Sequence, residues 1–287
     1  MTQRHGAPRR RTFDVSPGVT LVGDELGPVD ADAVVLLHGG GQTRQSWRGL
    51  QDALGARGVR TLSLDLRGHG ESSYAPDGDY RLEAFAADIA SVLRLLGGAP
   101  IVVGASLGGL AAIAALVEDG APARALVVVD VTHKIRTDGA AKIRDFMLAN
   151  PEGFASLDDA ADAVATYLPH RTRPASHAGL ERNLQRGADG RWRWRWDPNF
   201  INGNGEKSFR PLEPHMRALL PRLETPTLLI RGEASEIVTT EAADEFVALA
   251  PNARAVHLDG ATHMVAGDDN DAFMVTIADF VLPRLQG

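Results

Sequence analysis

Cysteine is absent from this chain of 287 residues, which excludes disulfide bonds, thiolate metal sites and cysteine nucleophiles. No run of about 18 apolar residues occurs either, so we expect no membrane-spanning helix. The arginines at positions 9–11 precede polar rather than apolar sequence, which argues against a secretion signal and favours a cytoplasmic protein. The formal net charge of −7 disfavours general binding to nucleic acid, because such binding needs clustered Lys and Arg to neutralise phosphates.

Hydrophobic residues make up 44% of the chain, enough for a sizeable core, and they recur in two patterns. Short runs rich in Val, Ile and Leu are typical of buried parallel strands, and they predict strands at 33–37, 59–64, 100–104, 125–130, 227–231 and 254–258. Apolar residues three to four positions apart predict helices at 47–57, 81–96, 107–119, 240–250 and 270–282. Segment 12–26, with its Ser-Pro-Gly turn, predicts a hairpin at the sheet edge. The alternation indicates an α/β fold, a mostly parallel twisted sheet with helices on both faces.

This alternation stops between residues 134 and 222. We therefore expect a core formed by 12–133 and 223–287, with 134–222 inserted after the sixth strand as a helical cap. The stretches IRDFMLAN, LDDAADAVATYL and AGLERNLQRG predict cap helices. Alternating Arg and Trp at 191–196 would suit a surface that binds single-stranded nucleic acid. In an acidic chain we favour a short extended segment after an Asp-Gly turn, with its tryptophans packed on the cap.

One serine lies between two close glycines in the stretch IVVGASLGGLAA, residues 101–112. Gly104, Ser106 and Gly108 fit the pattern G-x-S-x-G at a predicted strand-to-helix junction, where a nucleophilic serine is held on a tight turn. Bulky neighbours would clash there, so glycine on both sides leaves room for strained backbone torsions. The helix that follows directs its N-terminal N–H groups toward developing negative charge. The pattern predicts that Ser106 is a nucleophile.

A run of glycines after strand 33–37 is the second catalytic feature. His38 is followed by Gly39, Gly40 and Gly41, and such a run exposes the backbone N–H groups that an oxyanion hole requires. The N–H of Gly40 or Gly41 and that of Leu107 are predicted to converge on one oxygen atom. We interpret His38 as a buried structural residue that holds this loop.

The catalytic base and acid are expected to follow Ser106 in the order acid, then histidine. Of nine histidines, only His257 and His263 come after the last candidate acid. His257 lies within a predicted strand, whereas His263 lies in the loop at the carboxyl end of that strand, and we assign the base to His263. Two carboxylates fit the acid: Glu236, which we favour, and Asp130 as the alternative, each after a predicted strand. Either would orient the imidazole and stabilise its charged form.

Six stretches resemble the α/β-hydrolase superfamily in its order and spacing: LLHGGGQTRQSW, LDLRGHGESS, VVGASLGG, LVVVDV, LLIRGEASEIV and GATHMV. The likeness is greatest to capped serine hydrolases similar to epoxide hydrolases, C–C bond hydrolases and cofactor-free haloperoxidases. It implies the α/β-hydrolase fold, with Ser106 as the nucleophile and His263 as the base. It also implies an oxyanion hole formed by the N–H groups of Leu107 and of Gly40 or Gly41. Relatives usually carry Asp where this chain has Glu236, which leaves Asp130 as a rival acid.

The same resemblance assigns a bracing role to Arg67 and His69, in the turn LRGHG. It also argues against epoxide hydrolysis and haloalkane dehalogenation, because those relatives use an aspartate nucleophile where this chain has Ser106. Epoxide hydrolases also need cap tyrosines to activate the ring oxygen, and this cap offers only Tyr167.

The motifs predict a hydrolase that cleaves a small to medium, partly apolar carboxylic ester or lactone through an acyl-enzyme on Ser106. Cap residues Phe146, Tyr167, Trp192 and Trp194 are predicted to contact the substrate. C–C bond hydrolysis, perhydrolysis of the haloperoxidase type and lyase chemistry use the same triad and stay open, as does a non-catalytic ligand-binding protein on this scaffold.

No nucleotide-binding glycine motif and no histidine cluster at ligand spacing occurs, so we expect no cofactor and no metal. The expected partner is a small-molecule substrate, without nucleic acid or membrane, bound by a monomer or homo-oligomer.

Overall fold

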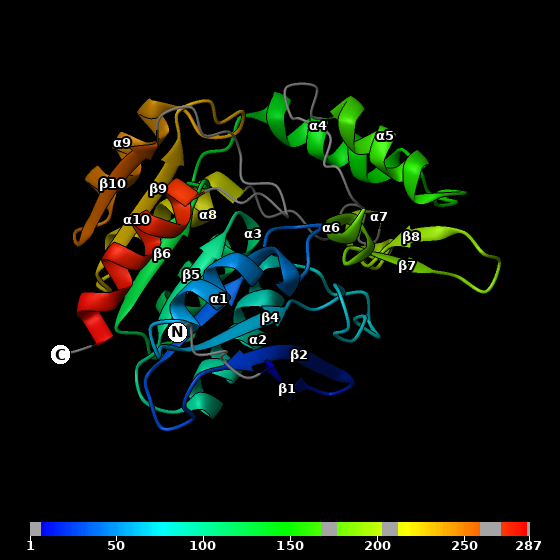
Figure 1. Ribbon diagram of the computed structural model, residues 1–287. Helices are drawn as coiled ribbons and strands as arrows, with labels where there is room; N and C mark the ends of the chain where they lie inside the picture. The colour runs from blue at the N-terminus through cyan, green and yellow to red at the C-terminus, as the bar shows by residue number, and fades with distance from the viewer. Residues whose placement is uncertain (1–6, 168–176, 203–211, 259–270, 286–287) are drawn as a thin grey trace.

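The computed structural model describes residues 7–167, 177–202, 212–258 and 271–285. Its main feature is an eight-stranded sheet with the strand order β1-β2-β4-β3-β5-β6-β9-β10 (Figure 1). The strands are β1 (Arg9–Ser16), β2 (Val19–Leu26), β3 (Ala33–Leu37), β4 (Arg60–Asp65), β5 (Ile101–Ala105), β6 (Ala125–Val129), β9 (Thr227–Gly232) and β10 (Ala253–Leu258). The hairpin β1–β2 lies at one edge, β2 and β4 are antiparallel, and the other neighbours are parallel. The predicted edge hairpin and mostly parallel sheet are confirmed.

Helices cover both faces of this sheet. The core helices are α1 (Arg48–Gly55), α2 (Leu82–Leu96), α3 (Leu107–Val117), α9 (Thr240–Leu249) and α10 (Asp271–Val281), with the short 3-10 helices η1 (Arg44–Trp47), η3 (Leu220–Arg222) and η4 (Leu282–Leu285). The predicted core strands and helices coincide with these elements, apart from shifts at their ends. Element type was therefore readable from the apolar patterns.

Two hydrophobic clusters explain why strands β3, β5 and β6 are apolar at every position. Val35 and Leu37 of β3 face the cluster that contains α2, α3 and α9. Val34 and Leu36 face the opposite cluster, which contains α1 and α10. Successive side chains of a strand point to opposite faces, so a strand covered on both faces is apolar throughout.

The cap follows β6 and lies to one side of the sheet (Figure 1). It contains α4 (Thr137–Leu148), α5 (Leu157–Tyr167), α6 (Ala178–Glu181), β7 (Leu184–Arg186), β8 (Trp192–Trp194) and α7 (Asn199–Asn202), with a small core of its own around Phe154, Ala160 and Leu184. The prediction of one helix over 178–187 is wrong beyond residue 181. The chain there turns into β7, which pairs antiparallel with β8 around the expected Asp-Gly turn, where Gly190 has a φ of +80°.

Helix α8 (Leu212–Leu219) closes the predicted cap segment but packs against α3. Met216 and Leu219 are buried in the same cluster as α2 and α3. The boundary of the cap at residue 222 stays a prediction.

Hydrogen bonds fasten the cap to the turn after β4. Gly70 N donates to Arg195 O at 2.7 Å, and Asp197 N donates to Gly68 O at 2.7 Å. Tyr80 Oη donates to Asp197 Oδ2 at 2.5 Å. The end of the cap hairpin is therefore held against the core.

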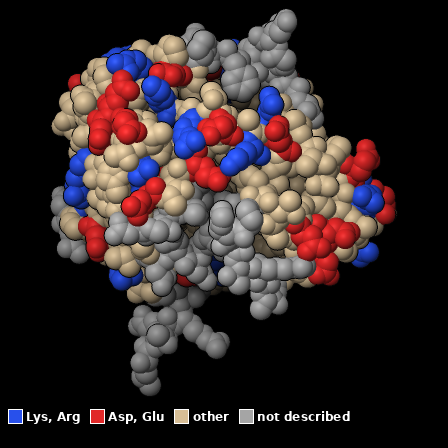
Figure 2. Space-filling model, turned by 90° about the horizontal axis from the view of Figure 1, so that it is seen from above, with Lys and Arg blue, Asp and Glu red and all other residues tan. Residues whose placement is uncertain are grey.

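The surface carries charges of both signs. Viewed from above, Lys and Arg are interspersed with Asp and Glu over the described residues (Figure 2). None of the described helices has both the length and the apolar character needed to cross a membrane.

Candidate active site

Ser106 occupies a strained turn between β5, which ends at Ala105, and α3, which begins at Leu107. Its φ of 47° and ψ of −116° are torsions that a residue with a side chain rarely adopts. A Cβ on Gly104 would lie 2.6 Å from backbone atoms of Gly108, and a Cβ on Gly108 would lie 2.7 Å from two backbone oxygens. The two glycines are therefore required by close backbone packing around the serine.

The glycine run after β3 lies directly beside this turn. A Cβ on Gly39 would lie 3.3 Å from Ser106 Cβ, and one on Gly40 would lie 3.9 Å from Leu107 Cδ2. Gly41 N donates a hydrogen bond of 3.0 Å to His69 Nε2. Among the described residues, the backbone N–H of Gly40 has no hydrogen-bond acceptor. The fold thus brings Ser106, Leu107 and the glycine run together.

Two buried histidines hold this loop in place. His38 Nδ1 lies 2.7 Å from Gly39 O and so carries the proton, while Leu66 N donates to His38 Nε2 at 3.0 Å. His69 Nδ1 lies 2.9 Å from Arg67 O, and the two imidazole rings are 5.1 Å apart. Burial lowers the pKa of His38 to about 4 and that of His69 to about 3, so both rings are neutral. Both histidines act as structural supports, as the sequence indicated.

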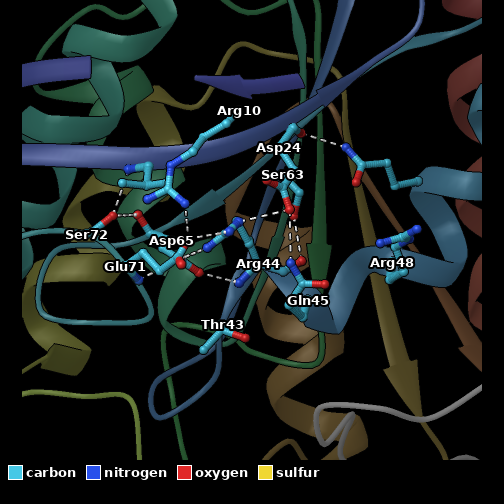
Figure 3. A network of polar contacts seen from close by, with 12 residues as sticks. Arg10, Asp24, Thr43, Arg44, Gln45, Arg48, Ser63, Asp65, Glu71 and Ser72 are labelled. Carbon is cyan, nitrogen blue, oxygen red and sulfur yellow. Dashed lines mark hydrogen bonds and ion pairs between the residues drawn. The ribbon is translucent and has the colours of Figure 1, made fainter. Parts of the chain in front are cut away.

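A network of charges fastens the far end of the same loop (Figure 3). Arg44 pairs with the buried carboxylate of Asp65, with Asp24 at 3.0 Å and with Glu71 at 2.6 Å, and Arg10 pairs with Glu71 at 2.7 Å. Arg44 N also donates to Asp65 Oδ1 at 2.6 Å. Burial opposes the charge of the guanidinium, but the surrounding carboxylates outweigh burial and raise the pKa of Arg44. The start of η1 is thereby tied to β4.

The alternative acid, Asp130, lies immediately after β6 and is fully buried. It has a positive φ of 49°. Its Oδ1 accepts a hydrogen bond from Gly232 N at 3.2 Å, and its Oδ2 accepts one from Ser235 Oγ at 2.8 Å. Ser106 N donates to Val129 O at 3.0 Å, so the nucleophile turn adjoins the residue before Asp130.

The favoured acid, Glu236, has different surroundings. Its side chain is 53% exposed and forms an ion pair of 3.6 Å with Lys142 of α4. Glu236 lines a polar pocket together with Arg136, Asp138 and Lys142. This carboxylate is therefore more accessible to water than that of Asp130.

The predicted base, His263, lies outside the described residues. His257, the other histidine considered, lies in β10, where Arg231 Nη1 is 3.5 Å from His257 Nδ1.

The predicted substrate contacts belong to an aromatic group in the cap. Phe146 stacks on Tyr167 with ring centres 4.4 Å apart, and Trp194 stacks on Trp196 at 5.1 Å. Phe146 and Trp194 are 5.7 Å apart, which joins the two pairs. Trp192 instead forms a backbone bridge with Phe154 at the base of this group.

Three further side chains reach the glycine run. A Cβ on Gly41 would lie 3.0 Å from Met147 Cε and 3.4 Å from Trp196 Cζ3, and one on Gly40 would lie 3.3 Å from Phe200 Cζ. Phe200 was not singled out by the sequence. Its position depends on the pairing of the cap hairpin with the turn after β4, and no local pattern signals such a long-range contact.

Comparison with known proteins identifies the family of this fold. The model of the alpha/beta hydrolase fold family matches residues 32–269. Esterase Rv0045c of Mycobacterium tuberculosis is 33% identical over 85% of this chain and 80% of its own length, and its structure superimposes with a TM-score of 0.75 over 96% of this chain and 92% of its own. The structure of E-2-(acetamidomethylene)succinate hydrolase has a TM-score of 0.83 at 25% identity, over 96% of this chain and 99% of its own.

A third relative is the sn-1-specific diacylglycerol lipase ABHD11 of Mus musculus, 27% identical over 89% of this chain and 82% of its own length. The predicted fold class and family resemblance are confirmed by the family match and the structural neighbours. The chain belongs to the alpha/beta hydrolase fold family and is an esterase-like hydrolase.

Proposed function

We propose that this enzyme hydrolyses small to medium carboxylic esters with an apolar acyl or aryl part, through an acyl-enzyme formed on Ser106. Backbone strain at two neighbouring strand ends carries the proposal. Of the non-glycine residues that the structure describes, Ser106 and Asp130 have a positive φ. The parallel register pairs Ala105 with Val129, so these two residues leave the sheet side by side. Strain of this kind collects at functional sites.

In the proposed reaction His263 removes the Ser106 hydroxyl proton as the oxygen attacks the ester carbonyl. Negative charge on the carbonyl oxygen is stabilised by the N–H groups of Gly40 and Leu107. We assign this role to Gly40 rather than Gly41, because the N–H of Gly41 is already donated to His69. Collapse expels the alcohol, which takes the proton from His263, and water then releases the acid by the same steps.

Asp130 is the acid of this proposal. It is buried, it is adjacent to the nucleophile turn, and both of its oxygens are held by donors. Glu236 is half exposed and paired with Lys142 of α4. A carboxylate that orients a catalytic imidazole works best when it is fixed and shielded from water, which favours Asp130.

The substrate class follows from the side chains nearest to the glycine run. Around Gly40 and Gly41 they belong to Phe200, Leu107, Met147 and Trp196, all of them apolar, whereas the polar Gln42 lies beside Gly39. Such surroundings suit an apolar acyl or aryl group better than a succinate derivative, whose carboxylates bind best to cations. The names of two relatives, an esterase and a diacylglycerol lipase, support ester hydrolysis.

The first test is covalent labelling with a fluorophosphonate, followed by intact-mass spectrometry and mapping of the modified peptide. A single adduct on Ser106 is expected, and Ser106→Ala should abolish both the adduct and hydrolysis of p-nitrophenyl butanoate. A folded Ser106→Ala protein that still turns over this ester would refute the acyl-enzyme. Tight ligand binding without turnover would favour a binding protein instead.

The acid is tested by comparing Asp130→Asn with Glu236→Gln. We expect Asp130→Asn to lower kcat by about a thousandfold or more, because the imidazole loses its orienting carboxylate. Glu236→Gln should cost little, because its carboxylate contacts Lys142 rather than the reacting groups. The opposite pattern would assign the acid to Glu236.

A further inference from the structure

The hydroxyl of Ser235 lies in the connection between β9 and α9, and the proposed reaction does not use it. Its oxygen is 2.8 Å from Asp130 Oδ2, 105 residues away in the chain. Ile237 N and Val238 N both donate to the same hydroxyl oxygen, at 3.3 Å and 3.1 Å. Ser235 is 9% exposed and therefore nearly buried.

These contacts fix the direction of the hydroxyl proton. A serine hydroxyl has one proton to donate and two lone pairs with which to accept. Two backbone N–H groups occupy the lone pairs, so the proton points at Asp130. An ionised carboxylate only accepts, which makes Asp130 the matching partner.

Ser235 acts together with the backbone of its own loop. Gly232 N donates to Asp130 Oδ1 at 3.2 Å, so one oxygen is held by a backbone N–H and the other by the hydroxyl. A carboxylate held at both oxygens cannot rotate about its terminal bond without breaking a hydrogen bond. It can accept about four hydrogen bonds, so these two donors leave capacity for an imidazole N–H.

We propose that Ser235 is a positioning residue that sets the rotation of the Asp130 carboxylate for catalysis, an inference that rests on Asp130 being the acid of the proposed function. Ser235 does not contact the substrate. It acts by holding the plane of the carboxylate in the orientation that the base requires. A small misplacement of a catalytic group lowers the rate strongly, because the reaction needs aligned partners.

The experiment compares Ser235→Ala with Ser235→Thr, using p-nitrophenyl butanoate and pH profiles of kcat and kcat/KM. Ser235→Ala should lower kcat by about tenfold or more and leave KM nearly unchanged, because orientation is lost but binding is not. The acid limb of the kcat/KM profile, which reports protonation of the catalytic imidazole, should move to higher pH, because a carboxylate with one donor fewer stabilises the imidazolium more strongly. Ser235→Thr keeps the hydroxyl and should restore both properties.

Thr239→Ala is the matched control. Thr239 lies in the same connection, and its hydroxyl oxygen accepts from Ala242 N at 3.1 Å as the N-cap of α9. Loss of this cap should lower the Tm, and neither kcat nor the acid limb should change. If Ser235→Ala does not fold, Ser235→Cys keeps the size of the side chain but donates weakly, and it should lower kcat in the same sense.

Asp130→Asn, measured in parallel, separates the two proposals. An inactive Asp130→Asn protein together with an unchanged kcat and acid limb in Ser235→Ala would overturn only the role of Ser235. Equal effects of Ser235→Ala and Thr239→Ala on kcat would reduce Ser235 to a structural residue of the loop. An active Asp130→Asn protein would overturn the acid assignment and the role of Ser235 with it.

Discussion

Acidification should destabilise the folded enzyme through the two histidines that support the glycine run. His38 and His69 are fully buried, and each ring accepts a backbone hydrogen bond at Nε2, which only the neutral form can do. Burial lowers the pKa of His38 to about 4 and that of His69 to about 3, from an ordinary value of 6.5. The unfolded chain therefore binds protons at these sites at a pH where the folded protein does not.

The sign and size of the effect follow from that difference. The contribution of the neutral rings is complete above the unfolded pKa of 6.5 and is lost as the pH falls toward the folded pKa values of about 4 and 3. At pH 5 each histidine lowers the free energy of unfolding by about 2 kcal/mol relative to its value at high pH. The pair costs about 4 kcal/mol, which is a large part of the roughly 5–15 kcal/mol that stabilises a typical domain.

Urea unfolding followed by tryptophan fluorescence at pH 8 and pH 5 measures this loss. His69→Gln is the informative variant, because its amide oxygen can accept from Gly41 N and the side chain does not titrate. Between pH 8 and pH 5, the loss of stability that comes from these two sites should be about half as large in the variant as in the parent. Carboxylates elsewhere titrate alike in both proteins and cancel in the comparison. Equal pH-dependent losses in parent and variant would refute the reasoning.

Three further substitutions test other parts of the structure. Arg67→Ala should cost about 3–5 kcal/mol in urea unfolding, because it leaves the buried Asp88 carboxylate, which Arg67 contacts twice at 2.7 Å, without its partner. Truncating both residues should cost less than truncating Arg67 alone. Gly108→Ala should lower the Tm or the soluble yield, because a Cβ 2.7 Å from backbone oxygens costs about 1–3 kcal/mol or more. Trp194→Ala should raise KM for a naphthyl ester by about tenfold, with less effect on an acetate of a small alcohol, if stacking in the cap binds the apolar part.

The core could be predicted from the sequence because its elements are defined by local patterns. The strand Val34–Val35–Leu36–Leu37 is apolar at every position, and the structure packs alternate side chains into separate clusters on the two faces of the sheet. The same pattern recurs in β5 and β6, and helices alternate with the parallel strands. Order, spacing and period together leave few alternatives to a covered parallel sheet.

The cap could not be predicted to the same depth, because its structure depends on partners far away in the chain. Leu184 lies in a stretch with helical spacing, yet it pairs with Trp194 across a hairpin and packs beside Phe154 and Ala160. Tertiary packing here outweighs local preference. The position of Phe200, in α7, beside Gly40 has the same origin, since the pairing of the hairpin with the turn after β4 brings it there.

The proposed nucleophile could be identified from the sequence and the proposed acid could not, although both lie at adjacent strand ends with a positive φ. Serine with a positive φ needs glycine neighbours where the backbone approaches closely, and that need appears in the sequence as Gly104 and Gly108. Aspartate tolerates a positive φ far better, so Asp130 requires no glycine beside it and resembles the end of any buried strand. Its support comes instead from Ser235, 105 residues later, whose hydroxyl points inward while the next side chain points outward. Chain order alone does not distinguish Asp130 from Glu236, so the proposal of Asp130 as the acid depends on the hydrogen bonds of the folded loop.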